Sequence, residues 1–211
     1  MAIQRGKIKK APAKEIVDYL IRPAIASDLQ RSYQTFLDIN KAHVLMLAKQ
    51  GIIEKDVAKQ ILQVTQEIAS MQDNPQFEII PDVEDLYFNF ERYLIKRTSL
   101  EVGGQQHTAR SRNDMFATQI RYDARRVFLE LCQHFNTLRR NFLQLARNNT
   151  DAVMSGYTHL QPSEPITLAH YCSAVLNAMS RDYERLSHVW TTINQCPLGG
   201  GSMGSTTFNI D

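Results

Sequence analysis

Residues 114–148 read DMFATQIRYDARRVFLELCQHFNTLRRNFLQLARN, and this stretch decides the fold. Its apolar residues recur at alternating steps of four and three, the heptad-like period of a long α-helix that packs along a partner. The seam consists of Ile120, Ala124, Phe128, Leu131, Phe135, Leu138, Phe142 and Leu145. Because the apolar seam of so long a helix is narrow, we expect a second helix to run along its length.

The expected partner helix follows Pro165, which we interpret as a first-turn proline. Its apolar seam has the same spacing. The seam consists of Leu168, Cys172, Val175, Met179, Tyr183, Leu186 and Trp190. Two long antiparallel helices that are joined by a loop predict an extended helical bundle.

Three shorter helices are predicted before the long one, at about residues 30–50, 54–71 and 83–96. Gly51 is placed as the C-terminal stop of the first of these helices. Residues 99–112 carry no helical stripe, so we expect them to form a loop that leads into the long helix. The sequence is therefore interpreted as helical through most of its length.

The composition narrows the class of protein. The net charge of the 211 residues is +2, which gives no reason to expect nucleic acid or a membrane surface as a partner. No apolar run approaches the length of a membrane span, and the basic residues 1–15 lack the apolar core of a secretory signal. Cys132, Cys172 and Cys196 are widely spaced and are typical of reduced cytosolic thiols, so we predict a cytoplasmic protein.

Residues 197–211 are rich in Gly, Ser and Thr and are predicted to form a loop. They have the composition of a phosphate-binding loop but lack its GK[ST] ending. Nor does the chain contain a typical His-based metal spacing or a GxGxxG loop before a helix. We therefore predict no metal and no cofactor.

The first of two polar loops, residues 107–114, reads HTARSRND. Ser111, Asn113 or Asp114 is expected to cap the helix that follows. Arginine offers a bidentate fork, and the first amides of a helix favour an anion, so the loop is suited to bind a carboxylate. Alternatively, the same residues form a solvated capping loop with surface arginines.

The second polar loop, residues 155–162, reads SGYTHLQP. His159 can carry a proton near neutral pH, and Thr158 beside it can hold a carboxylate. Alternatively, the histidine donates to the backbone of a tight turn and has no catalytic role.

Other ionisable residues have simpler interpretations. The acidic string at residues 82–85 is accounted for by the helix dipole alone. His134 and His188 lie on polar helix faces and are predicted to be surface residues. His43 and His170 lie nearer apolar positions and are predicted to be hydrogen-bonded core histidines.

Taken together, these segments resemble the argininosuccinate lyase branch of the fumarase/aspartase superfamily. Residues 107–114 are similar to its HTxRSRND string, and residues 156–170 are similar to its GYTHLQ…QPVTFAH segment. Residues 197–211 resemble its PLGxGAxxGTxxxID stretch, and residues 38–53 resemble an early helix of the branch. These segments occur in the same order as in the branch, from about Ile25 onward.

The resemblance implies an all-α fold. Residues 1–112 would form an N-terminal helical domain, and residues 113–211 would form the first, truncated part of a central helical bundle. It also implies a homotetramer with active sites that are shared between subunits. The implied reaction is a cofactor-free anti elimination, in which an N-substituted aspartate such as argininosuccinate gives fumarate and an amine or guanidine.

The resemblance also implies roles for individual residues. His159 matches the histidine that is tied to proton transfer, and Thr158 is placed beside it as a catalytic residue. Charge builds on a substrate carboxylate in the transition state, which fits a receptor of this kind. The residues that match substrate-binding positions are Ser27, Ser111, Arg112, Asn113 and Thr158.

Three departures from the branch pattern are present. Nothing in the chain matches the serine-bearing loop that carries the expected proton-abstracting base, so we expect this chain alone to be inactive. Arg31 stands where the branch has an acidic residue, and Tyr87 replaces the histidine of an EDIH-like string. Both changes concern the half of the pocket that recognises the leaving amine.

Two alternatives therefore stay open. The chain can belong to a lyase specific for another N-succinyl amine, such as an aminopolycarboxylate. It can also be a non-catalytic structural homologue of the crystallin kind. A bare helical assembly module is a third possibility, but such a module has no use for two polar loops of this composition.

Overall fold

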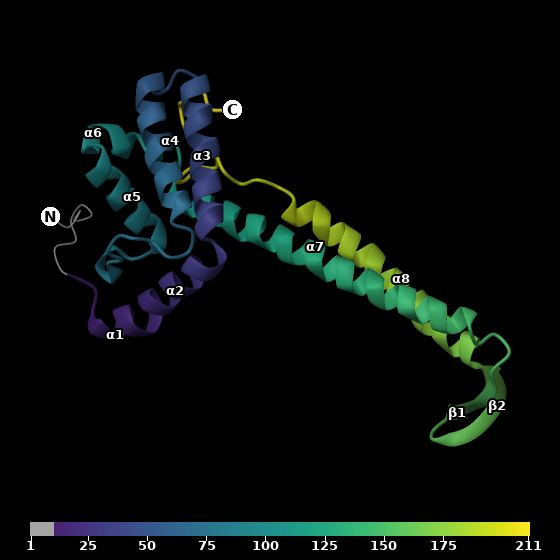
Figure 1. Cartoon of the computed structure of the whole chain (residues 1–211). Helices are drawn as coiled ribbons and strands as arrows, with labels where there is room; N and C mark the ends of the chain where they lie inside the picture. The colour runs from purple at the N-terminus through teal and green to yellow at the C-terminus, as the bar shows by residue number, and fades with distance from the viewer. Residues whose placement is uncertain (1–10) are drawn as a thin grey trace. The chain divides into compact units, whose positions relative to one another are not determined.

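The computed structural model describes residues 11–211 (Figure 1). Most of the basic segment in which we predict no secretory signal therefore lies outside the described residues. Of the described residues, 11–123 together with 196–211 form one compact unit, and 124–195 form the other. The domain boundary after residue 112 stays a prediction.

The first unit is built almost entirely from helices. Short π-helical and 3-10 segments connect some of them, at Val17–Ile21, Pro81–Val83 and Gly104–His107. The helices are α1 (Lys14–Ile16), α2 (Arg22–Arg31), α3 (Tyr33–Lys49), α4 (Lys55–Ser70), α5 (Leu86–Arg97), α6 (Leu100–Gly103) and the start of α7 (Arg112–Arg147).

Helices α3 and α4 form an antiparallel pair, and both match their predicted ranges closely. Gly51 ends α3 with φ of +68°, a conformation that glycine adopts without steric cost. The amide of Ile52 then donates to the carbonyl of Leu47 at 2.9 Å, which is the long-range bond of a Schellman cap. Gly51 is therefore confirmed as the stop signal.

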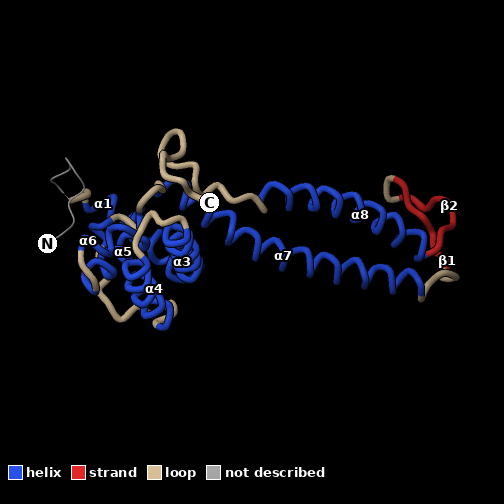
Figure 2. Tube along the Cα trace, turned by 90° about the horizontal axis from the view of Figure 1, so that it is seen from above, coloured by secondary structure: helices blue, strands red, loops and turns tan. Residues whose placement is uncertain are grey.

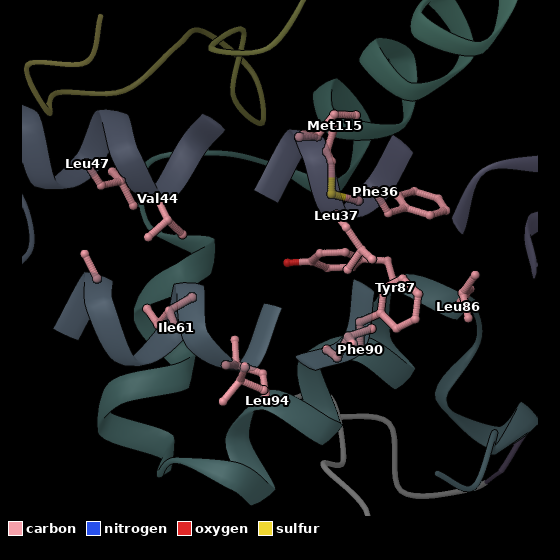
Figure 3. Packing of buried hydrophobic residues seen from close by; sticks show 14 of the residues in the cluster. Phe36, Leu37, Val44, Leu47, Ile61, Leu86, Tyr87, Phe90, Leu94 and Met115 are labelled. Carbon is pink, nitrogen blue, oxygen red and sulfur yellow. The ribbon is translucent and has the colours of Figure 1, made fainter. Parts of the chain in front are cut away.

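The core of this unit is formed where α3, α4 and α5 meet the first turns of α7 (Figure 3). Phe36, Ile61, Tyr87 and Met115, one from each of these helices, are fully buried. The ring of Tyr33 packs edge-on against the ring of Phe90, with centroids 4.9 Å apart. Each such aromatic pair adds stability beyond its buried area.

Two predicted boundaries were wrong. Helix α5 begins at Leu86 rather than at residue 83, because Glu84 has φ of +76° and Asp85 caps the helix by accepting a hydrogen bond from Phe88 N at 2.8 Å. Residues 99–112 are not only a loop. They contain α6 and a 3-10 turn, and the side chain of Ser99 caps α6.

The second unit contains the rest of α7, the strands β1 (Val153–Thr158) and β2 (Gln161–Thr167), and α8 (Leu168–Ile193). Figure 2 shows the two strands as a short antiparallel hairpin that connects the two long helices. Apart from this hairpin, the described chain has no strands, so the all-α fold is confirmed.

Aromatic contacts set the register between α7 and α8. Phe128 stacks on Trp190 with ring centroids 5.7 Å apart, and Phe135 stacks on Tyr183 at 6.4 Å. Along each helix the two contact residues are seven positions apart, in opposite chain directions. This is the heptad spacing of an antiparallel pair, so the predicted partner helix is confirmed.

Only part of the predicted α7 seam faces α8. Phe128, Phe135 and Phe142 are half-buried, whereas most of the remaining seam residues are exposed. The exposed members are Ile120, Leu131, Leu138 and Leu145. A single partner helix therefore covers one side of the α7 seam and leaves the other side uncovered.

Pro165 and His170 were predicted wrongly. Pro165 is not in the first turn of α8 but in β2, where it lies opposite Ser155 of β1. Thr167 caps α8 instead, because its side chain accepts a hydrogen bond from His170 N at 3.1 Å. The ring of His170 is exposed because the first turn of α8 turns it outward, so it is not a core histidine.

None of the helices in the described part of the chain combines the length and the apolarity that crossing a membrane requires.

Two leucines of α3 offer a matched test of the core. Leu47 is fully buried, whereas Leu45 is 57% exposed. We expect Leu47→Ala to lower the free energy of unfolding by about 2–5 kcal/mol, because it leaves a cavity. Leu45→Ala should change it by less than about 1 kcal/mol. Urea unfolding measures both, and equal losses would show that α3 packs with a different face inward.

Candidate active site

The start of α7 is held by a capping box. The side-chain oxygen of Ser111 accepts a hydrogen bond from Asn113 N at 3.1 Å. In return, Oδ1 of Asp114 accepts one from Ser111 N at 3.1 Å. This reciprocal pattern satisfies two of the amides that a helix start leaves without partners. Ser111 is therefore confirmed as the cap, and the polar loop is anchored at the point where the helix dipole favours an anion.

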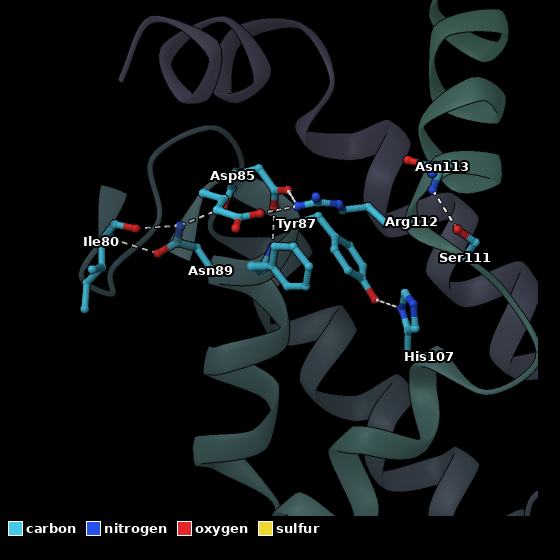
Figure 4. A network of polar contacts seen from close by, with 10 residues as sticks. Ile80, Asp85, Tyr87, Asn89, His107, Ser111, Arg112 and Asn113 are labelled. Carbon is cyan, nitrogen blue, oxygen red and sulfur yellow. Dashed lines mark hydrogen bonds and ion pairs between the residues drawn. The ribbon is translucent and has the colours of Figure 1, made fainter. Parts of the chain in front are cut away.

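Arg112 projects from the first turn of α7 toward the acidic string before α5 (Figure 4). Its Nη1 atom donates to Oε2 of Glu84 at 2.7 Å and to Oδ2 of Asp85 at 2.9 Å. The guanidinium also lies over the ring of Phe88, 4.9 Å from its centroid. The acidic string thus does more than cap a helix, because it orients the guanidinium of Arg112.

Asn89 of α5 holds the acidic string in place. Its amide group is buried and bonds to both the N–H and the C=O of Ile80, at 2.7 and 3.2 Å. The same side chain donates to the carbonyl of Asp85 at 2.8 Å. The backbone that carries Glu84 and Asp85 is therefore fixed by the core, and Arg112 meets a rigid acceptor.

A second cluster of carboxylates includes Asp28 of α2. The half-buried Asp28 has a pKa that is raised to about 6, first by burial and then by the negative charges of Asp85 and Asp123. Asp123 accepts hydrogen bonds from Ser32 at 2.7 Å and from Gln119 at 2.6 Å. Three acidic side chains thus lie close enough to influence one another in this unit. Carboxylates so arranged favour a cationic group nearby.

Both residues of α2 that the sequence analysis singled out, Ser27 and Arg31, are exposed.

Tyr87, by contrast, lies in the interior. Its hydroxyl is 2.8 Å from Nδ1 of His107 and accepts a hydrogen bond from Nη2 of Arg110 at 3.2 Å. Nη2 of Arg110 also donates to Asn40 at 2.6 Å. The tyrosine that departs from the branch pattern is therefore part of a buried polar cluster behind the loop.

His43 belongs to the same cluster. Its Nε2 atom is 2.8 Å from the carbonyl of Thr108, and the residue is buried. Its pKa is lowered to about 4, first by burial and then by the charge of Arg110. The prediction of a hydrogen-bonded core histidine is confirmed for His43. His134 and His188 are exposed, as predicted.

Thr158 and His159 lie at the tip of the hairpin in the second unit. Thr158 pairs with Gln161, so His159 and Leu160 form a two-residue turn with φ of +48° and +62°. This is the pattern of a type I′ turn, which usually requires Asn or Gly at both positions. Leu160 is 92% exposed. A histidine and a leucine here are strained, and strain of this kind is concentrated at functional sites.

Gly156 shapes the hairpin below the turn. The register between β1 and β2 shifts between Ser155 and Tyr157, which is a β-bulge. A Cβ atom at Gly156 would lie 2.9 Å from the carbonyl oxygen of Glu164, so only glycine fits without rearrangement. The bulge strengthens the twist that presents the Thr158–His159 corner to solvent.

The structure places the candidate residues in two groups, each within its own unit. Ser27, Ser111, Arg112 and Asn113 belong to the first unit, and Thr158 and His159 belong to the second. Among the described residues, no group of three His, Cys, Asp or Glu side chains is arranged to hold a metal ion.

Sequence analysis missed one set of residues near Arg112, namely Glu84, Asp85 and Asp28. The signal for the first two was present, because an acidic string precedes α5 at residues 82–85. Its contact with an arginine 27 and 28 positions later is invisible to local patterns. Asp28 adjoins Ser27, but only packing brings its charge near those of Asp85 and Asp123.

Comparison of the sequence with known proteins identifies its family. A family model described as Lyase matches residues 25–211. The chain is 45% identical over 206 residues to argininosuccinate lyase 1 of Shouchella clausii. It is 34% identical over 212 residues to argininosuccinate lyase of Methanosarcina acetivorans. These alignments cover 98% and 99% of this chain but 41% of each relative, so the chain spans about two fifths of the length of these relatives.

Solved structures show the same fold. EDDS lyase in complex with formate superposes with a TM-score of 0.78 at 26% identity, over 96% of this chain and 39% of that protein. A fumarate lyase:delta crystallin from Brucella melitensis bound to cobalt superposes with a TM-score of 0.72 at 14% identity, over 91% of this chain and 46% of that protein. The second match supports the fold alone.

The family model and the fold together define the class of protein as the helical lyases. The chain belongs to the lyase family and, within it, to the argininosuccinate lyase branch of the fumarase/aspartase superfamily.

The raised pKa of Asp28 predicts a pH-dependent stability effect. Above pH 6 the folded protein carries a carboxylate in a place that disfavours its charge, and well below the ordinary pKa of 3.8 the group is neutral in both folded and unfolded states. We therefore expect Asp28→Asn to raise the melting temperature at pH 8 and to have a much smaller effect at pH 4.

Asp151→Asn, at an exposed position, serves as the control and should change neither value. A lower melting temperature of Asp28→Asn at pH 8 would contradict the assignment, because it would show that the Asp28 carboxylate has a stabilising partner.

Proposed function

We propose that the protein is a carbon–nitrogen lyase that catalyses reversible anti β-elimination of an N-substituted aspartate. The products are fumarate and an amine or a guanidine, and the reaction needs no cofactor. The observation that carries this proposal is the anchored start of α7, where Ser111, Arg112 and Asn113 surround a helix N-terminus. Membership of the lyase family supports the reaction class.

The proposed chemistry follows from the residue types. Ser111, Arg112 and Asn113 hold substrate carboxylates, and Thr158 contributes a hydroxyl donor to the same task. Elimination builds negative charge on the carboxylate beside the carbon that loses its proton, so donors placed there stabilise the transition state. His159 is proposed to exchange a proton with the leaving nitrogen. We propose none of the described residues as the base that abstracts the carbon-bound proton.

Nη1 of Arg112 is engaged by Glu84 and Asp85, so the pair holds the arginine by one corner of its fork. A planar fork that is fixed at one corner can present its other donors in a defined direction. This arrangement supports a role in binding a carboxylate rather than a simple surface position. The side chain of Arg112 is 31% exposed, so a small ligand can reach it.

Argininosuccinate is the first proposed substrate, because both relatives compared above are named argininosuccinate lyases. Another N-substituted aspartate is the second, because the chain also resembles EDDS lyase, a variant of which has been solved with bound fumarate. The carboxylates of Asp28, Asp85 and Asp123 favour a substrate whose amine end is positively charged. Ser27, exposed beside Asp28, is proposed to contact the same end.

The proposed assembly is a homotetramer whose subunits share active sites. Leu131, Leu138 and Leu145 form an exposed apolar row on α7, and such a row on a long helix is typical of a face that packs against further helices. The exposed, strained hairpin tip is equally suited to a contact outside its own unit. Both features support assembly from several copies of the protein.

The test of the proposed function is fumarate release by the product of the complete gene. Argininosuccinate, EDDS and other N-substituted aspartates are offered side by side, and ultraviolet absorbance follows fumarate. We expect release from at least one of them. Release from argininosuccinate alone would make the changes at Arg31 and Tyr87 incidental to specificity.

Release only from another member of the panel would keep the reaction and point to a different leaving amine. A folded assembly that releases fumarate from none of them, and that does not bind fumarate, would overturn the proposal in favour of a structural, crystallin-like role.

His159 is the residue whose change separates chemistry from assembly. We expect His159→Asn to lower kcat by about 10²–10⁴-fold, the usual contribution of a general acid or base. Asparagine also tolerates a positive φ, so the turn should survive. Leu160→Asn is the matched control, because it makes the same change at the second turn position. Loss of the assembly state in sedimentation of His159→Asn would instead show a structural role.

A further inference from the structure

Asp114 makes more contacts than a capping box requires. It lies in the first turn of α7 and is only 7% exposed. Oδ1 accepts the hydrogen bond from Ser111 N described above. The other oxygen, Oδ2, accepts hydrogen bonds from Gly199 N at 3.1 Å and from Gly201 N at 2.8 Å. One carboxylate therefore connects the polar loop to a segment 85 residues further along the chain.

The glycine-rich tail is shaped to make this contact. Gly199 and Gly201 have φ of +102° and +65°, so their amides can point toward one anion. A Cβ atom at Gly201 would lie 2.6 Å from the carbonyl oxygen of Ser205, which excludes any larger residue without rearrangement. The segment that resembles a phosphate-binding loop in composition thus binds an anion of its own chain, the carboxylate of Asp114.

Leu198 of the tail packs partly buried against the core, whereas the other polar anchors between the tail and the helices are exposed. Lys49 contacts Asp211 at 2.8 Å, and Asn209 donates to Gln50 at 3.3 Å. Exposed ion pairs of this kind contribute little stability, because water and salt screen them. The bonds to Asp114 are partly buried and charge-assisted, and charge-assisted bonds are roughly twice as strong as neutral ones.

We propose that Asp114 is a positioning residue for the proposed carboxylate site, and that it acts by tying the glycine-rich tail to the start of α7. This inference rests on the proposed function. The carboxylate cannot rotate without losing either the bond to Ser111 or the bonds to the two glycines. Ser111 and Asn113, which are proposed to contact the substrate, are therefore held by the tail as well as by their own helix.

Two substitutions break this connection from opposite sides. Asp114→Asn leaves only one acceptor oxygen, so the side chain can accept from Ser111 N or from the two glycine amides but not from both. Gly201→Ala displaces the Gly201 amide, because its Cβ atom meets the carbonyl oxygen of Ser205. Asp114→Glu keeps a carboxylate, and glutamate is an established partner in capping boxes, but its longer side chain moves the charge away from the glycines.

Gly204→Ala is the matched control in the same tail. No atom lies within 4 Å of a Cβ atom built there, and Gly204 does not have a positive φ. Leu47→Ala is a second control, because it weakens the core of the same unit but changes neither Asp114 nor the groups bonded to it. Both controls should bind fumarate as the wild type does.

The experiment measures fumarate affinity by calorimetry on the product of the complete gene, well below the melting temperature of every variant. We expect Asp114→Asn, Asp114→Glu and Gly201→Ala each to weaken fumarate binding at least about tenfold, the loss that follows from one misplaced charge-assisted bond. The double variant Asp114→Asn/Gly201→Ala should bind about as weakly as either single variant, because both changes break one connection.

Wild-type affinity in Asp114→Glu would overturn the inference, because it would show that the cap suffices without the tail. Losses that multiply in the double variant, or an equal loss in Leu47→Ala, would overturn it too.

Hydrogen exchange of the unliganded protein tests the connection without any ligand. Asp114→Asn should speed exchange at Gly199, Gly201 and Ser111 together, and unchanged exchange there would also overturn the inference. If wild type does not bind fumarate but this exchange is coupled, the proposed function fails and the connection stands.

Discussion

A single partner helix covers only part of the apolar seam of α7. The phenylalanines of the seam pack against α8, whereas Leu131, Leu138 and Leu145 remain exposed. Exposed leucines along so long a helix are costly in water, because the hydrophobic effect scales with the apolar area in contact with it. This constraint explains why a hairpin of two helices is an incomplete structural unit, and it is the physical basis of the proposed assembly from several copies.

The start of α7 is polar, and its hydrogen-bonding groups must find partners. Ser111 and Asp114 satisfy the first amides of the helix, and Arg112 is held by Glu84 and Asp85. The contacts of Asp114 and Arg112 involve charged groups, so leaving one of their partners unmatched costs more than a neutral bond contributes. The polar loop is therefore a rigid receptor rather than a flexible surface segment, and rigidity is what a site needs in order to stabilise developing charge.

The hairpin places strain where the candidate proton donor lies. His159 and Leu160 adopt positive φ values that asparagine or glycine would adopt at less cost. Their strain is supported by the antiparallel pairing of β1 and β2 on either side and by the bulge at Gly156. A tight turn presents the His159 ring at a corner, where a longer and more relaxed loop would leave its direction undefined.

The sequence by itself determined the elements whose signals are local. The stop at Gly51, a polar cap at the start of α7 and the seven-residue spacing of α7 and α8 each depend on residues within a few turns of one another. Tertiary structure alone decided which groups meet across the chain. It placed Pro165 in a strand, brought Glu84 and Asp85 to Arg112, and joined Asp114 to the glycines of the tail. Such contacts depend on packing between segments that lie far apart in the chain, and no local pattern records them.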